Sequence, residues 1–158
     1  MKLKTAFSRN HCKDMIRENL SRVSLPFGFE RYTGWYVLGF FSIAYHDGNE
    51  LRRFYPIKNK ILGYIKETHN QTHVIYKHFS GYTDFISFAI IFIFSLLLIM
   101  LANHEHNIGI GACLLFTGLY TSLVALFTYL ATRLSKQGNS NRIKLESYLV
   151  SLLELYSD

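Results

Sequence analysis

The histidines are the residues of this sequence best suited to bind a metal ion. The chain has seven, and two groups are closely spaced: His104 with His106, and His69 with His73 and His78. A protein metal site needs three or four converging ligands at defined spacing, and neither group adds cysteine or carboxylate partners in a known pattern. We therefore interpret these histidines as solvated or interfacial, and we predict that the protein holds no metal and no cofactor.

Known catalytic motifs do not occur in the sequence. It contains no Gly-x-Ser-x-Gly elbow, no Gly-x-x-x-x-Gly-Lys-Ser/Thr loop, no His-Glu-x-x-His and no Cys-x-x-Cys. The acidic residues of the first half are scattered and offer no close pair for general-acid catalysis: Asp14, Glu18, Glu30, Asp47, Glu50, Glu67 and Asp84. We therefore predict that the protein is not an enzyme and has no catalytic residues.

The densest cluster of basic residues lies beside two aromatic residues and consists of Arg52, Arg53, Lys58 and Lys60. Such a cluster suits anionic lipid headgroups or an anionic ligand, although the sequence does not identify a small molecule. The alternative interpretation is the solvated edge of a strand. A net charge of +6 is also compatible with nucleic acid. A membrane protein that keeps its basic residues on one side has the same charge, so no nucleic-acid partner is expected.

Small residues gather on one face of a predicted apolar helix and suit close packing between helices. They are Gly111, Gly118, Ser122 and Ala125. Gly118 and Ser122 form a small-xxx-small pair, which lets a second helix approach closely. Three threonines add hydroxyl groups to the same helix: Thr117, Thr121 and Thr128. The partner is either the other apolar helix of this chain or another subunit. A water-lined pore is less favoured, because neither apolar segment contains an ionisable side chain of the kind that marks ion pathways.

Two apolar segments lie in the second half of the chain. Residues 85–102 include only Ser87 and Ser95 as polar residues, and as a helix they would extend about 27 Å, near the minimum needed to cross a bilayer. Residues 108–132 carry no charge and would extend about 37 Å, so this helix must tilt or project from the bilayer. The connection between them, 103–107, is too short for a domain. The sequence therefore predicts an α-helical membrane protein with a two-helix transmembrane hairpin.

The distribution of lysine and arginine predicts the orientation of this hairpin. Residues 1–84 contain thirteen Lys or Arg against seven Asp or Glu, and residues 133–158 contain four against three. The connection between the helices has Glu105 and no Lys or Arg. Because basic residues are retained on the cytoplasmic side, we expect a multi-pass protein with two spans and both termini inside. A bacterial inner membrane is favoured over an organelle inner membrane.

Residues 1–84 are predicted to form a small cytoplasmic α+β domain. An amphipathic helix over 10–24 carries Met15, Ile16, Leu20 and Val23 at helical spacing. This helix packs on the domain or, in the alternative, lies on the membrane surface. A hairpin is expected over 34–55, with its turn at Asp47-Gly48, because Asp-Gly is favoured in tight primed turns.

The rest of this domain is predicted from weaker patterns. Residues 56–68 fit a helix that begins at Pro56, whereas a strand here would require burial on both of its faces. Residues 72–79 fit a short strand or, in the alternative, the lead-in to the membrane.

The C-terminal segment 133–158 is predicted to be a cytoplasmic amphipathic tail. A linker over 135–140 precedes a helix capped by Ser140 or Asn141, with an apolar stripe made of Leu145, Leu149, Leu152 and Tyr156. This stripe lies on the bilayer, packs against the N-terminal domain or pairs with a copy of itself.

These features together favour a protein of assembly rather than chemistry. The leading hypothesis is a non-enzymatic integral membrane subunit that assembles, through its transmembrane hairpin and cytoplasmic domain, into a homo- or hetero-oligomeric membrane complex. Its expected partners are the lipid bilayer and other membrane protein subunits or copies of itself. The alternatives are a self-assembling membrane effector or channel gated by a ligand bound to the N-terminal domain, and an immunity-type membrane protein.

Overall fold

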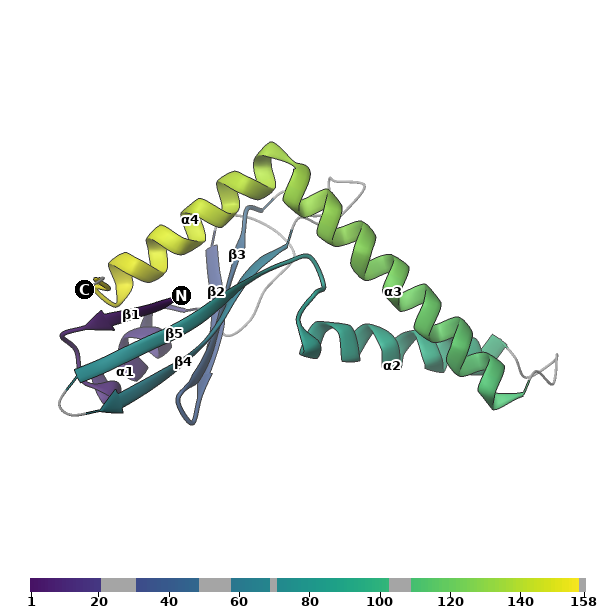
Figure 1. Cartoon of the computed structure of the whole chain (residues 1–158), viewed down its shortest axis with the longest axis horizontal. Coiled ribbons are helices and arrows are strands. Elements are labelled where there is room, and N and C mark those ends of the chain that lie inside the picture. Colours follow the sequence, from purple (N-terminus) through teal and green to yellow (C-terminus); the bar gives the residue numbers. More distant parts are fainter. Residues whose placement is uncertain (21–30, 49–57, 69–70, 103–108, 157–158) are drawn as a thin grey trace.

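The computed structural model describes residues 1–20, 31–48, 58–68, 71–102 and 109–156, and its elements run through the whole chain (Figure 1). In chain order they are β1 (Lys2–Thr5), α1 (Arg9–Asn19), β2 (Arg31–Val37), β3 (Phe40–His46), β4 (Asn59–Thr68), β5 (Gln71–Ser80), α2 (Phe85–Ala102), α3 (Ile110–Leu134) and α4 (Lys136–Leu152).

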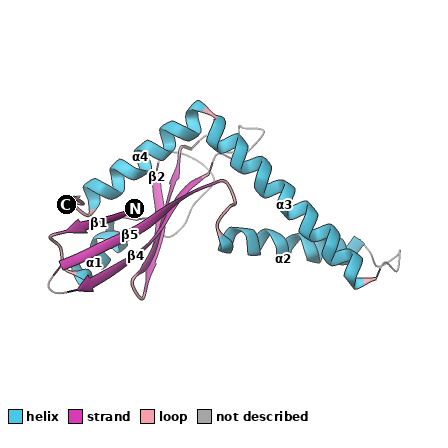
Figure 2. Ribbon diagram, in the orientation of Figure 1, coloured by secondary structure: helices cyan, strands magenta, loops and turns pink. Residues whose placement is uncertain are grey.

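The strands form one antiparallel sheet with the order β1-β5-β4-β3-β2 (Figure 2). Alternate residues of a strand point to opposite faces, so the register separates a core face from an open face. On the core face, Phe41 and Ile43 of β3 lie beside Ile61 of β4, and all three are fully buried. The helices α1 and α4 cover this face, and their apolar side chains complete the core.

The first hairpin of the sheet turns earlier than the sequence predicts. Val37 pairs with Phe40, so the turn consists of Leu38 and Gly39, with φ angles of 51° and 98°. The prediction of a turn at Asp47-Gly48 was wrong for this hairpin. Positive φ is uncommon for leucine, so Leu38 does not indicate a turn within this run of aromatic and β-branched residues. The predicted return strand, 51–55, lies outside the described residues.

The predicted helix over 56–68 was also wrong, since Asn59–Thr68 forms the central strand β4. This strand pairs with β3 on one side and β5 on the other. Ile61 and Ile65 are fully buried on the core face, whereas Leu62 and Tyr64 are half-buried on the open face. Burial is therefore complete on one face and partial on the other. Pairing to two neighbouring strands outweighs a weak local preference for helix.

The remaining predictions for this domain agree with the structure in part. The strand β5 covers the predicted strand 72–79. The helix α1 begins at Arg9, one residue before the predicted helix 10–24, and ends at Asn19, whereas 21–24 lie outside the described residues. Cys12, Ile16 and Leu20 are buried against the sheet, as the packed interpretation of this helix requires. The short edge strand β1 was not predicted.

The C-terminal helix begins earlier than predicted and belongs to the core. Ser135 is its N-cap, so residues 136–140 of the expected linker are helical, and neither Ser140 nor Asn141 is the cap. Leu145, Leu149 and Leu152 are buried against the sheet, which selects packing on the N-terminal domain among the three alternatives. Tyr156 departs from the predicted stripe: it is half-exposed, and its backbone pairs with Lys4 of β1. Both ends of the chain therefore build one domain.

The helices α2 and α3 are inserted into this domain between β5 and α4 and project away from it (Figure 1). Both are long and apolar enough to cross a membrane, by length and composition. The bounds of α2 equal the predicted span 85–102, and α3 is displaced by two residues from the predicted 108–132. The expected outer connection, 103–107, lies outside the described residues.

Candidate functional site

The junction between the sheet and α2 is held by an ion pair. Lys60 Nζ on β4 lies 3.0 Å from Asp84 Oδ1 and donates a hydrogen bond of 3.1 Å to Ser87 Oγ. Asp84 Oδ1 also accepts from the backbone N–H of Ser87, in the first turn of α2. A carboxylate at this position satisfies a free N–H and suits the positive end of the helix dipole.

Asp84 is fully buried, and this burial alone would raise the pKa of its carboxyl group. The hydrogen bonds from Ser87 and the positive charge of Lys60 outweigh burial, so the pKa is lowered overall. Asp84 is therefore charged at neutral pH and fixes where α2 leaves the sheet.

The end of α3 is packed closely on the same junction. Gly81 has a φ of 66°, and a Cβ atom added to it would lie 2.7 Å from the backbone of Thr128 and Tyr129. The backbone N–H of Lys58 donates to Thr132 Oγ1 at 3.4 Å. Only glycine permits this approach of the two chain segments. The last turns of α3 are thus packed directly on the end of the sheet.

The threonine face of α3 is buried and packs toward α2. Cys113, Thr117 and Thr121 recur every four residues and are at most 3% exposed. The hydroxyl of Thr117 donates to the carbonyl of Cys113 at 2.7 Å, and that of Thr121 donates to the carbonyl of Thr117 at 2.8 Å. These hydroxyl groups are satisfied within their own helix, as is common for threonine in apolar helices.

The predicted small-residue face of α3 does not pack inside the chain. It lies about a quarter turn from the threonine face, and it consists of Gly111, Gly118, Ser122 and Ala125. A Cβ atom added to Gly111 or Gly118 would meet no atom of the described chain within 4 Å. Ser122 is exposed and Ala125 is half-exposed. The prediction that this face contacts α2 is not met, whereas the prediction that it contacts another subunit is untested.

An apolar groove separates α2 from α3 on one side of the hairpin. Its volume is about 710 Å³, and it is lined mainly by large apolar side chains together with Tyr82, Ser95 and Tyr120. Ser95 is the one buried residue of α2.

A pocket with a cationic lining lies where β5, α3 and α4 meet. Its volume is about 360 Å³, and its lining consists of Lys77, His78, Phe79, Ser80, Thr83, Tyr129, Arg133 and Arg142. This lining contains three permanent cations and no carboxylate. Burial lowers the pKa of His78 and the charge of Arg142 lowers it further, while the nearby carboxylate of Glu146 acts in the opposite direction. Both ring nitrogens of His78 lack a hydrogen-bond partner among the described residues. The pocket therefore suits an anion with several acceptor oxygens, such as a phosphate group.

The sequence did not indicate this pocket, because its cations are far apart in the chain. The predicted basic cluster of Arg52, Arg53, Lys58 and Lys60 is a different set. Arg52 and Arg53 lie outside the described residues. Lys58 lies 5.0 Å from the ring centroid of Tyr82, and Lys60 is paired with Asp84. The two described lysines therefore support the junction.

The histidines that the structure describes do not converge. His73 and His78 lie on β5 five residues apart and so belong to opposite faces of the sheet. His69, His104 and His106 lie outside the described residues. In the part of the chain that the structure describes, no three His, Cys, Asp or Glu residues are grouped as a metal site would require.

Comparison with known proteins gives no match: no family model, no curated protein and no solved structure is similar to this chain.

Proposed function

We propose that this protein is a non-enzymatic integral membrane subunit that assembles with other subunits or with copies of itself through its α2–α3 hairpin. One observation carries the proposal. The small-residue face of α3 is open at Gly111 and Gly118, while a separate face of α3 packs on α2. The hairpin therefore has an internal contact between α2 and α3 and a second face that, among the described residues, packs against nothing at Gly111 and Gly118.

In lipid, the hydrophobic effect does not drive helices together. Apolar side chains gain nothing by leaving lipid for one another, so contacts depend on close backbone approach at small residues. The exposed leucines of α3 contact lipid in a single chain as favourably as they would contact a neighbouring subunit. The small-residue face at Gly118 differs from the leucine surface, because the backbone of a second helix packed there can approach the backbone of α3 closely.

Assembly is tested by substituting Gly118 with leucine. The space around Gly118 is open, so the Gly118→Leu variant should keep the fold of the single chain and lose the contact with a neighbour. The measurement is cross-linking in native membranes, followed by native mass spectrometry in mild detergent. The matched control is Leu119→Ile on a lipid-facing part of α3, which should assemble as the unchanged protein does. An unchanged protein that stays monomeric and co-purifies with nothing would contradict the proposal.

The proposal places both termini in the cytoplasm, in keeping with the excess of lysine and arginine outside the hairpin. Labelling with a membrane-impermeant thiol reagent tests the orientation. A cysteine introduced at His104 should react from outside the cell. Reaction from the cytoplasmic side alone would reverse the topology.

A ligand-gated membrane effector is a second candidate function, favoured by the cationic pocket. The pocket lies between β5 and the last turns of α3, so an anion bound there would contact both the domain and the hairpin. The hydroxyl groups of α3 do not add support, because Thr117 and Thr121 donate to their own helix.

Pyrophosphate is a suitable probe for this pocket. We expect it to raise the melting temperature of the detergent-solubilised protein, and the Arg142→Ala variant should lose the effect. The Lys136→Ala variant removes a charge that does not line the pocket and serves as the control. Ion flux through reconstituted vesicles, with and without pyrophosphate, tests gating. Flux that stays absent in both conditions would remove this candidate.

A further inference from the structure

The open face of the sheet has an unusual composition for a surface that faces water. Near the β2–β3 turn it exposes apolar side chains: Trp35 is 42%, Val37 55%, Phe40 56% and Leu38 83% exposed. The register places Val37, Phe40, Tyr64 and Ile75 in one row across four strands. A contiguous apolar patch of this kind marks a contact surface.

Basic residues surround this patch on the same face. The register places them there as Lys2, Lys4, Arg31, Lys60, Lys66 and Lys77, with His46 and His73. Among the described strands, no aspartate or glutamate occupies an open-face position, since Glu67 pairs with Thr72 on the core face. The face therefore combines an apolar corner at the β2–β3 turn with lysine and arginine side chains around it, of which Lys60 is paired with Asp84.

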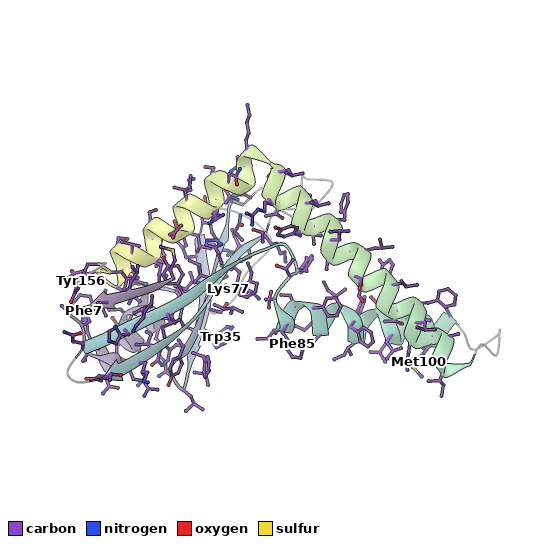
Figure 3. All side chains as sticks on the ribbon, viewed as in Figure 1. Phe7, Trp35, Lys77, Phe85, Met100 and Tyr156 are labelled. Atoms are coloured by element: carbon purple, nitrogen blue, oxygen red, sulfur yellow. The ribbon has the colours of Figure 1, made fainter. Side chains whose placement is uncertain are left out.

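The apolar corner is continuous with the start of α2. Ile86, in the first turn of α2, lines the same hollow of about 580 Å³ as Trp35, Phe40 and Leu62. Lys60 on the open face also reaches Asp84 and Ser87. Figure 3 labels Trp35 on the sheet and Phe85 at the start of α2. If α2 enters a membrane at Phe85, the apolar corner lies at the membrane surface.

We propose that the open face of the sheet docks on the anionic cytoplasmic leaflet, with the β2–β3 turn inserted among the lipid headgroups. The inference rests on the proposed function, in which α2 and α3 span the membrane. Tryptophan and apolar side chains are favoured at the depth of the headgroups. Lysine and arginine beside them are attracted to anionic lipid.

Lipid suits this face better than a second copy of the chain. Two such faces would bring like charges together, whereas an anionic leaflet offers negative charge around an apolar interior. The leaflet is also present wherever α2 begins, so the contact needs no further partner. The docked sheet would hold the domain at a fixed tilt to the hairpin.

Trp35 is the single tryptophan of the chain, so its fluorescence reports directly on this face. The full-length protein is reconstituted into vesicles of phosphatidylcholine with phosphatidylglycerol that carry a quencher at headgroup depth. We expect strong quenching of Trp35 and roughly twofold weaker quenching in phosphatidylcholine alone, because the attraction to anionic lipid is lost. A Ser151→Trp, Trp35→Phe variant, with its probe on an exposed position of α4, should show little quenching in either.

A second probe separates this inference from the proposed function. In a Phe94→Trp, Trp35→Phe variant the fluorophore lies midway along α2, and brominated acyl chains should quench it deeply. If this probe is quenched and Trp35 is not, docking of the sheet is overturned while the membrane span stands. If neither probe is quenched, the span and the docking both fail. Shielding of Trp35 from acrylamide that depends on protein density, without quenching by lipid, would show a second copy on this face and overturn the inference.

The tip of the turn gives a charge test. Leu38 has a φ of 51°, a conformation that aspartate tolerates better than most residues, so Leu38→Asp should leave the sheet intact. We expect this variant to increase quenching of Trp35 by acrylamide in anionic vesicles roughly twofold, since a carboxylate is expelled from an anionic surface. Unchanged acrylamide quenching, with the far-ultraviolet circular dichroism also unchanged, would overturn the insertion of the turn.

Discussion

Asp84 shows how a single residue connects the two parts of this molecule. Its carboxylate caps α2 through the N–H of Ser87 and pairs with Lys60 of the central strand. The sequence offers Asp84 as one acidic residue among several. Its role depends on β4 being a strand, which brings Lys60 to the end of β5.

The Asp84→Asn variant should destabilise the domain at neutral pH by about 1–3 kcal/mol, because a buried charged hydrogen-bonded group is lost. The pKa of Asp84 is lowered in the folded state, so its contribution is present above the pKa of the unfolded chain, near 3.8. It is lost as the pH falls through the folded pKa. The free energy of unfolding is measured by urea titration at pH values from 2 to 7, with Trp35 fluorescence as the signal. The variant should lose part of the acid sensitivity, whereas Asp14→Asn, at an exposed position of α1, should retain it.

At the scale of elements, α4 is the helix whose position the sequence left open. Its leucine stripe was predicted from spacing, yet spacing is the same for a helix on lipid, on a sheet or on a copy of itself. The structure seats the stripe on the core face, where Asn59 Nδ2 donates to the carbonyl of Gly138 at 2.8 Å. Gly138 was expected in a linker but lies inside the helix, where an added Cβ would meet the carbonyl of Thr132.

Truncation of the stripe should therefore destabilise the sheet. Leu149 is fully buried, and we expect Leu149→Ala to lower the free energy of unfolding by about 2–5 kcal/mol. Ile143 lies on the same helix and is 68% exposed, so Ile143→Ala should change it by no more than about 0.5 kcal/mol. Hydrogen exchange of β4 amides in nanodiscs gives both values. Equal protection of the β4 amides from exchange in the two variants would mean that the leucine stripe faces lipid or a second copy of the chain.

For the whole molecule, the core is closed by the two ends of the chain. Five leucines from the C-terminal part lie in it: Leu145, Leu149, Leu152, Leu153 and Leu155. Each buried leucine contributes about 1.5–3 kcal/mol, and an entire domain is stable by only about 5–15 kcal/mol. The domain is thus not complete at residue 84.

A chain that ends at Leu134 should consequently fail to fold its sheet, although both hairpin helices remain. Hydrogen exchange should show β4 and β5 amides without protection and α2 amides still protected by lipid. A synthetic peptide of residues 135–158 added in trans should restore protection of the sheet. Protection of β4 without the peptide would contradict a shared core.

The sequence by itself determined the features that depend on composition and local spacing. The bounds of α2 followed from an uninterrupted apolar run, β5 and α1 from short-range patterns, and the excess of basic residues from counting. Each of these is a property of neighbouring residues, so no contact distant in the chain is needed to predict it.

Only the tertiary structure decided the rest. Three features depend on partners that are distant in the sequence: the strand β4, the turn at Leu38-Gly39 and the packing of α4 on the sheet. Such pairing outweighs weak local preferences. The open face follows from the same pairing, since Trp35 and Lys77 share a surface only once the register is fixed. The cationic pocket likewise needs Arg133 and Arg142 to meet at the bend between α3 and α4.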